Sequence, residues 1–171
     1  MLGFNLSPFT ARIPAIAAAL LVLPAAVIAL APGSDAATTN QELTVKVSKV
    51  KALDRLDEFS KGDLYVRVTI DGEVQSSPVV RVESVNKLDW KLSKKVSRGE
   101  HKVKVELLDK DLTQDDAIDI NRVDKKRDLD FTVTSGCRIE GFSSAYKCGS
   151  SITRTGAEKK KAEITFSVSV K

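Results

Sequence analysis

The stretch DLYVRVTIDG, residues 63–72, decides the fold class. Its apolar residues fall on every second position: Leu64, Val66, Val68 and Ile70. This period of two is typical of a β-strand with one buried face. The dipeptide Asp71-Gly72 that follows is a strong hairpin signal. The stretch therefore predicts a half-buried strand that ends in a tight turn.

The same alternation recurs in both directions along the chain. It is seen in Leu43, Val45 and Val47, in Leu88, Trp90 and Leu92, in Val103, Val105 and Leu107, and in Ile164, Phe166, Val168 and Val170. Another strand is expected at residues 129–133, and further turns at residues 84–87 and 97–99, with a break at Pro78. No helical period competes, and the short intervals leave no room for crossover helices. The predicted fold is all-β, an antiparallel β-sandwich of about eight strands.

The N-terminal residues 1–37 have the pattern of an export signal. Arg12 is the only charged side chain before an apolar run over residues 13–31, and small residues near Ala36 offer a cleavage site. A retained anchor is the alternative, although Pro14 and Pro24 interrupt the run. We expect a secreted or extracellular protein, or one associated with the cell envelope. Residues 38–171 are one domain's worth of chain.

Two cysteines, Cys137 and Cys148, enclose ten residues. In the oxidising compartment that an export signal implies, this pattern predicts a disulfide, with two free thiols as the alternative. A zinc site would need further ligands, and the single histidine, His101, lies on a predicted strand without a partner motif. His101 is therefore interpreted as structural.

Acidic residues gather in two loops, residues 54–63 and 109–119. If successive strands reverse direction, the loops after the first and fifth strands emerge at the same end of the sandwich. The two loops hold nine acidic and three basic residues, whereas the rest of the chain after residue 37 holds 13 and 23. Converging carboxylates repel one another, and calcium, which takes six to eight oxygen ligands in flexible geometry, would relieve that repulsion. The alternative is that aspartate is simply common in turns.

These residues resemble the C2 domain, a family of eight-stranded sandwiches that commonly bind calcium and phospholipid. The resemblance covers roughly residues 42–121. In the family's first calcium loop, two aspartates lie six positions apart, and the second begins a strand. Asp57 and Asp63 have this spacing, and Asp63 begins the similar stretch Asp63-Leu64-Tyr65-Val66-Arg67-Val68. The family's second calcium loop begins with Asp-x-Asp and continues to a further aspartate that precedes Ile-Gly. Asp109 and Asp111 are similar to the first motif, and Asp116 and Ile118 are similar to the second. The turn at Asn86 and Trp90 is also similar, while Leu64 replaces the family's proline and Asp119 its glycine.

The resemblance implies a calcium site and a membrane contact. The implied calcium ligands are Asp57, Asp63, Asp109, Asp111 and Asp116, with Asp115 able to substitute for Asp116. The residues implied to dip into an anionic phospholipid membrane are Leu56, Phe59 and Leu112. For Phe59, packing under the loops is an equal alternative.

Other functions stay open or are disfavoured. A calcium-independent structural or adhesive module that binds a protein or a glycan is the main alternative. An enzyme is not expected, because the sequence has no nucleophile paired with a base and no glycine-rich phosphate cradle. Nucleic-acid binding is not expected either, since there is no aromatic platform or basic helix. The basic residues outside the loops, including Lys91, Lys94, Lys95 and residues 159–161, are interpreted as a solvated face.

Overall fold

The computed structural model of the chain describes residues 40–54, 62–81, 84–85, 87–123 and 125–171. All of them belong to one unit, residues 36–171. The proposed export signal, residues 1–37, lies outside the described residues. Within the described part of the chain, no helix is long and apolar enough to cross a membrane.

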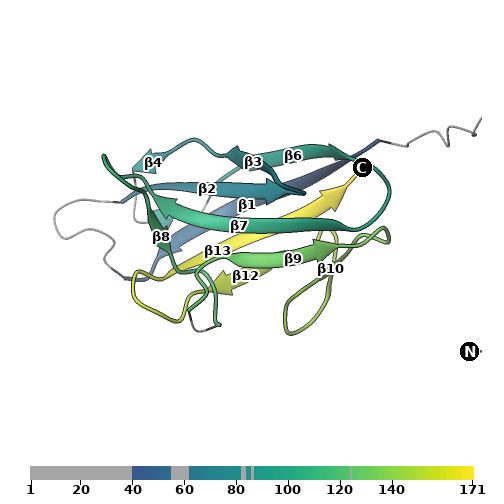
Figure 1. The fold of residues 1–171 in the computed structure, drawn as a ribbon. Helices are drawn as coiled ribbons and strands as arrows, with labels where there is room; N and C mark the ends of the chain where they lie inside the picture. The colour runs from purple at the N-terminus through teal and green to yellow at the C-terminus, as the bar shows by residue number, and fades with distance from the viewer. Residues whose placement is uncertain (1–39, 55–61, 82–83, 86, 124) are drawn as a thin grey trace, which may run out of the picture. The chain divides into compact units, whose positions relative to one another are not determined.

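Two antiparallel sheets lie one over the other (Figure 1). In the first sheet, the long strand β1 (Gln41–Ala52) pairs on one side with β13 (Ala162–Val170), which pairs in turn with β12 (Ile152–Thr155). The other side of β1 pairs with two successive strands, β5 (Ser84–Val85) and β6 (Trp90–Val96). This sheet therefore brings together the two ends of the described chain.

The second sheet is centred on β7 (His101–Asp109), which lies between β2 (Asp63–Ile70) and β9 (Leu129–Val133). Outside β2 lie β3 (Glu73–Ser76) and β4 (Val80–Arg81), and outside β9 lie β10 (Arg138–Glu140) and β11 (Tyr146–Lys147). The short strand β8 (Asp116–Ile118) pairs with the last residues of β7. The observed fold confirms the predicted all-β antiparallel sandwich.

The core between the sheets is built from the alternating residues that the sequence showed. In β2, Leu64, Val66, Val68 and Ile70 are all buried. In β1 the buried positions are Leu43, Val45 and Val47 and then, three residues later, Val50. The register with β13 shifts between Val47 and Lys49, and this bulge returns the strand to its buried face. A strand longer than the predicted run can therefore keep one face in the core.

Some of the predicted boundaries are wrong. Residues 84–87 were expected to be a turn, but Ser84 and Val85 form β5 and pair with Lys51 and Val50. The strand predicted from Leu88 begins only at Trp90, since Leu88 is bound through its N–H to the Ser48 carbonyl at 2.9 Å, outside the ladder. Both local signals were overridden by pairing with β1.

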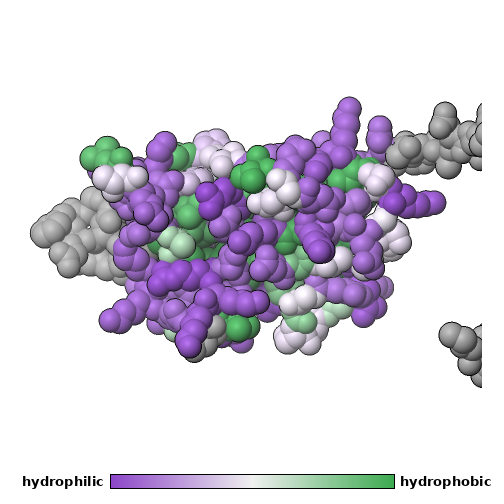
Figure 2. Space-filling model, viewed as in Figure 1, coloured by the Kyte–Doolittle hydropathy of each residue, from purple (hydrophilic) through white to green (hydrophobic). Residues whose placement is uncertain are grey.

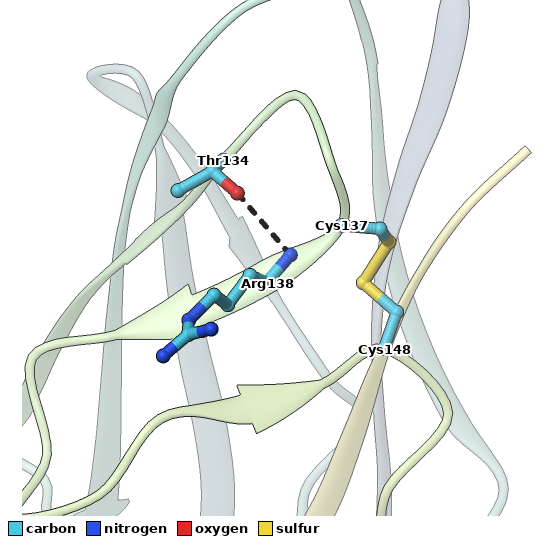
Figure 3. The surroundings of a disulfide bond; sticks show 4 residues. All are labelled: Thr134, Cys137, Arg138 and Cys148. Carbon is cyan, nitrogen blue, oxygen red and sulfur yellow. Dashed lines mark hydrogen bonds between the residues drawn. A yellow bond between two sulfur atoms is a disulfide. The ribbon is translucent and has the colours of Figure 1, made fainter.

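Three short strands in the region after residue 134, β10, β11 and β12, were not predicted. Each is two to four residues long, and Ile139 and Ile152 are their only buried apolar residues. Such strands carry too little alternation to be recognised. The predicted disulfide, Cys137–Cys148, is present and joins the two sides of the β10–β11 hairpin, with Cα atoms 5.4 Å apart (Figure 3).

A glutamine side chain joins the edges of the two sheets. Gln75, on β3, accepts a hydrogen bond from the Ser93 N–H at 2.9 Å and donates one to the Ser93 carbonyl. Ser93 lies on β6, whose other side pairs with β1. The amide group of Gln75 therefore bonds to the outward-facing backbone of an edge strand, as a neighbouring strand would.

His101 has the structural role that the sequence indicated. It is buried at the start of β7, and its ring nitrogens lie 2.7 Å from Asp71 Oδ2 and 2.9 Å from the Ser97 carbonyl. Asp71 Oδ1 also accepts the Lys102 N–H at 2.9 Å. Burial acts to raise the pKa of Asp71, but the hydrogen bonds from His101 and Lys102 outweigh it and hold the pKa below its ordinary value. The pair ties the turn between β2 and β3 to the turn between β6 and β7.

This contact predicts a pH dependence of stability. Because the pKa of Asp71 is lowered by folding, its ionised form stabilises the native state above the ordinary aspartate pKa of 3.8, and that contribution is lost as pH falls through the lowered value. Asp71→Asn should therefore lower the melting temperature at pH 7 and have a shrinking effect below about pH 4. Asparagine tolerates the positive φ of 46° at this turn. Thermal melts from pH 2 to 7 test this, with the exposed Asp130→Asn as the control; a constant difference between Asp71→Asn and wild type would contradict it.

Candidate functional site

The start of β2 and the end of β7 bring two of the predicted ligands together. Leu64 pairs with Asp109 in the sheet register, so Asp63 lies beside the last residue of β7. The Asp63 N–H donates to Asp109 Oδ1 at 2.6 Å, and the Lys110 N–H donates to the Asp63 carbonyl at 2.9 Å. Asp109 is only 2% exposed. Two acidic residues 46 positions apart in the sequence therefore share one end of the sheet.

The neighbouring strand β8 adds a third predicted ligand. Asp116 is the cross-strand partner of Asp109, and its side chain is half-exposed. The loop between the two strands, residues 110–115, therefore leaves the sheet beside Asp109 and returns beside it. The expectation that the two acidic loops reach the same end of the sandwich holds for their described residues.

Asp111 and Asp115 lie in this connecting loop. The Asp111 N–H donates to Asp115 Oδ1 at 3.1 Å, and the Tyr65 hydroxyl donates to Asp115 Oδ2. The hydrogen bond from Tyr65, followed by that from Asp111, lowers the pKa of Asp115. Burial, together with the hydrogen bond to Asp115, raises the pKa of Tyr65 to about 12. Tyr65 therefore holds the loop against β2 through a carboxylate that stays ionised.

Basic side chains also reach this end, which the sequence did not reveal. Arg81, on β4, places Nε 3.7 Å from Asp63 Oδ1, and Lys160, in the connection between β12 and β13, pairs with Asp116. Both pairs are substantially exposed, so each contributes little to stability. Their effect is local: they offset part of the negative charge at Asp63 and Asp116.

Asp119 does not belong with the other loop acids. Its side chain is fully buried, and its carboxylate accepts the backbone N–H groups of Asn121, Ala157 and Glu158 at 2.9, 2.8 and 2.6 Å. Its backbone also bonds to Lys160 and Ala162. This residue, which stands where the C2 pattern has glycine, fastens the β12–β13 connection to the segment after β8. The sequence could not distinguish this buried acid from its exposed neighbours.

The remaining predicted residues divide between described and undescribed parts of the chain. Asp57, Leu56 and Phe59 lie outside the described residues. Leu112 is fully exposed at the tip of the loop between β7 and β8. Figure 2 shows that the face in view is mostly hydrophilic, with small separate apolar areas.

The residues present fit calcium in chemistry, but they do not form a closed cage. In the described residues, no group of three or more carboxylate, imidazole or thiol side chains is placed to hold one metal ion. The adjacent acids Asp63, Asp109 and Asp116 offer only oxygen atoms, which is the ligand type that calcium prefers. The predicted ligand set therefore stays a prediction, and its first loop contributes Asp57 from outside the described part of the chain.

Comparison with solved structures identifies the architecture. A structure described as a C2 domain matches with a TM-score of 0.52 at 14% identity, covering 76% of this chain and 97% of that one. The fold is that of a C2 domain. The sequence itself matches no family profile and no curated protein. The resemblance that the aspartate pattern implied is thus confirmed by the C2 fold.

Two larger proteins share this C2 fold over part of their length. Human GIVD cytosolic phospholipase A2, solved with an inhibitor and terbium chloride, matches 78% of this chain with a TM-score of 0.52 at 14% identity. A structure of two successive C2 domains of extended synaptotagmin 2 matches 88% of it with the same score at 13% identity. The chain spans 17% and 48% of those proteins. At such identities the likeness concerns the C2 fold alone.

Proposed function

We propose that this chain is an exported, non-catalytic C2 module that binds calcium at the β2–β7–β8 end and, with calcium bound, attaches to anionic phospholipid. The observation that carries the proposal is the hydrogen bond from the Asp63 N–H to the Asp109 carboxylate, which places residues of the two acidic loops side by side. The C2 fold of the solved structures that it resembles supports the same reading.

The electrostatics of this end favour a bound cation. Asp109 is buried beside Asp63 and Asp116, and Asp111 is exposed on the loop that follows. Like charges held this close repel one another, while a divalent cation is attracted to all of them. We expect Asp63, Asp109, Asp111 and either Asp115 or Asp116 to hold calcium together with Asp57.

The membrane part of the proposal rests on the same loops. When bound, calcium would supply positive charge that attracts anionic headgroups. Leu112, fully exposed beside the proposed ligands, would enter the interfacial region of the bilayer. Leu56 and Phe59 are proposed to do the same from the first loop.

Export supports a site of modest affinity. The disulfide between Cys137 and Cys148 is typical of proteins that fold in an oxidising compartment. Outside the cell, calcium modules work with dissociation constants of about 10⁻⁴ to 10⁻³ M. A few carboxylates partly offset by Arg81 and Lys160 would suffice there.

Calcium should stabilise the full chain against unfolding. At a hundredfold excess over the dissociation constant, binding to the native state alone adds about 2.7 kcal/mol, and the melting temperature should rise accordingly. Asp109→Asn should abolish the rise, because asparagine keeps an oxygen acceptor for the Asp63 N–H but loses the charge. Thermal melts with and without calcium measure the rise, and calorimetric titration measures the binding; the exposed Asp130→Asn is the control in both. Equal calcium binding by wild type and Asp109→Asn would reject the site.

Sedimentation with vesicles tests the membrane step separately. Full chain should pellet with phosphatidylserine vesicles in millimolar calcium, and remain in the supernatant with chelator or with purely phosphatidylcholine vesicles. If the chain binds calcium but does not sediment with the vesicles, the calcium site is supported and the lipid binding is rejected.

A second candidate function, a calcium-independent adhesive module for a protein or glycan, is favoured by one observation. Arg81 and Lys160 already pair with Asp63 and Asp116, so two of the described acids have counter-ions of their own. Under this alternative, calcium changes neither the melting temperature nor the sedimentation, and the titration above separates the two candidates.

A further inference from the structure

Arg154, on β12, is a half-buried arginine, and two of its donor atoms are themselves buried. Its Nε and Nη2 atoms are buried, and neither has a hydrogen-bond partner in the described part of the molecule. The guanidinium carbon lies 4.0 Å from the centre of the Phe142 ring and 5.6 Å from that of Tyr146. Both rings belong to the disulfide-closed segment between Cys137 and Cys148. The aromatic rings attract the charge but do not accept these two N–H groups in the plane of the guanidinium.

Unpaired donors of this kind lower the stability of the folded protein. Buried donors are nearly always paired, and an unpaired donor on a charged group carries a large desolvation penalty. Contact with the rings offsets only part of it. Nε and Nη2 lie on one edge of the guanidinium, and this edge forms the two-pronged donor that pairs with both oxygens of a carboxylate. The partner that matches this edge best is an oxyanion.

A pocket adjoins this side chain. It has a volume of about 360 Å³ and lies among β9, β12, the segment before β9 and the β10–β11 turn. Two further cations, Arg122 and Lys126, line it, and Asp130 is its only carboxylate among the described lining residues. Apolar contacts come from Val123, Leu129 and Phe142. Positive charge beside an apolar wall suits an anion that carries an apolar group.

We propose that this pocket, the Arg154 pocket, binds a small organic carboxylate. The carboxylate pairs with Nε and Nη2 of Arg154, and its apolar part packs against Leu129 and Phe142. Because both nitrogen atoms are covered by neighbouring side chains, entry of the ligand requires the guanidinium to turn toward the pocket. The residues involved are separate from the proposed calcium ligands, so the proposal stands independently of that function.

Benzoate is a suitable probe, because it joins a carboxylate to an aromatic ring. Calorimetric titration of the full chain in calcium-free buffer should show saturable binding of benzoate. Arg154→Met, which keeps the length and removes the donors, should weaken that binding at least tenfold, and Arg154→Lys should fall between the two. Arg138→Met, at an exposed arginine on β10 paired with Glu140, is the matched control and should leave binding unchanged.

The melting temperature of Arg154→Met and the binding of phosphate give two further tests. Since Arg154→Met removes unpaired buried donors, its melting temperature should equal or exceed that of wild type, whereas a purely structural arginine would leave a less stable protein. Inorganic phosphate, titrated in parallel, should bind more weakly than benzoate. The proposal is overturned if benzoate does not bind, if Arg154→Met and Arg154→Lys both bind it as wild type does, or if phosphate is preferred. A less stable or unfolded Arg154→Met would also count against the proposal, and the benzoate titration of Arg154→Lys would then decide it.

Discussion

Gly156→Ala should destabilise the protein by about 4 kcal/mol or more, because an added methyl group has no space. A Cβ at this position would lie 2.1 Å from the Asp119 carbonyl oxygen and 2.7 Å from the carboxylate carbon of the same residue. Both are parts of a buried unit that binds the Ala157 and Glu158 N–H groups. To relieve the clash, the β12–β13 connection must move away, which leaves a buried carboxylate with fewer donors.

Chemical denaturation of the full chain measures this loss of unfolding free energy. Gly136→Ala is the matched control, since its nearest neighbour would be the Thr134 hydroxyl at 3.9 Å, an ordinary contact. The control should change stability by less than about 1 kcal/mol. If the two alanine variants were equally stable, the close approach of Gly156 to Asp119 would be refuted.

Replacing both cysteines, Cys137→Ser with Cys148→Ser, should cost about 3 kcal/mol of stability. The bond closes a loop of 11 residues' separation and so restricts the unfolded chain. The strands inside this segment are short: β10 and β11 share two residue pairs, Arg138 with Lys147 and Ile139 with Tyr146, and β10 shares two more with β9. Loss of the bond should therefore free this hairpin first.

Reducing agent provides the internal control for the disulfide. It should lower the melting temperature of wild type to that of the double serine variant and leave the variant unchanged. Hydrogen exchange should increase most in residues 137–148, where Phe142 and Tyr146 cover Arg154. An unchanged melting temperature after reduction would mean that packing of Ile139 and Phe142 holds the hairpin without the bond.

The sequence predicted the strands that are long enough to show alternating burial. Strands β2, β7, β9 and β13 bury every second residue over five to nine positions, so their period is visible in the sequence. Strand β5 is only two residues long. It forms because β1 extends beyond the part that pairs with β6, so that Val50 and Lys51 can pair with β5. No local pattern encodes that pairing, and a turn was predicted in its place.

The candidate site was predictable only in outline. Reversal of successive strands placed Asp63 near Asp109, and the structure agrees. Asp116 and Asp119 are three positions apart but have different environments. Asp116 pairs with Lys160, whereas Asp119 accepts the N–H groups of residues 157–158, and these partners are about 40 positions away in the sequence. Arg154 is similar: its guanidinium lies against two rings of the disulfide-closed segment, Phe142 and Tyr146. Such partners come from tertiary contacts that aspartate spacing does not record.

The hydrogen bonds of Gln75 with Ser93 have a consequence for how copies of this protein behave in one another's presence. An unpaired strand at the border of a sheet is a template onto which a second molecule can add its own strand, the first step toward aggregates. By occupying both polar backbone groups of Ser93, one side chain blocks the middle of β6. Lysines at 91, 94 and 95 surround that point with positive charge. This border of the sandwich is thus protected from self-assembly with other copies of the chain.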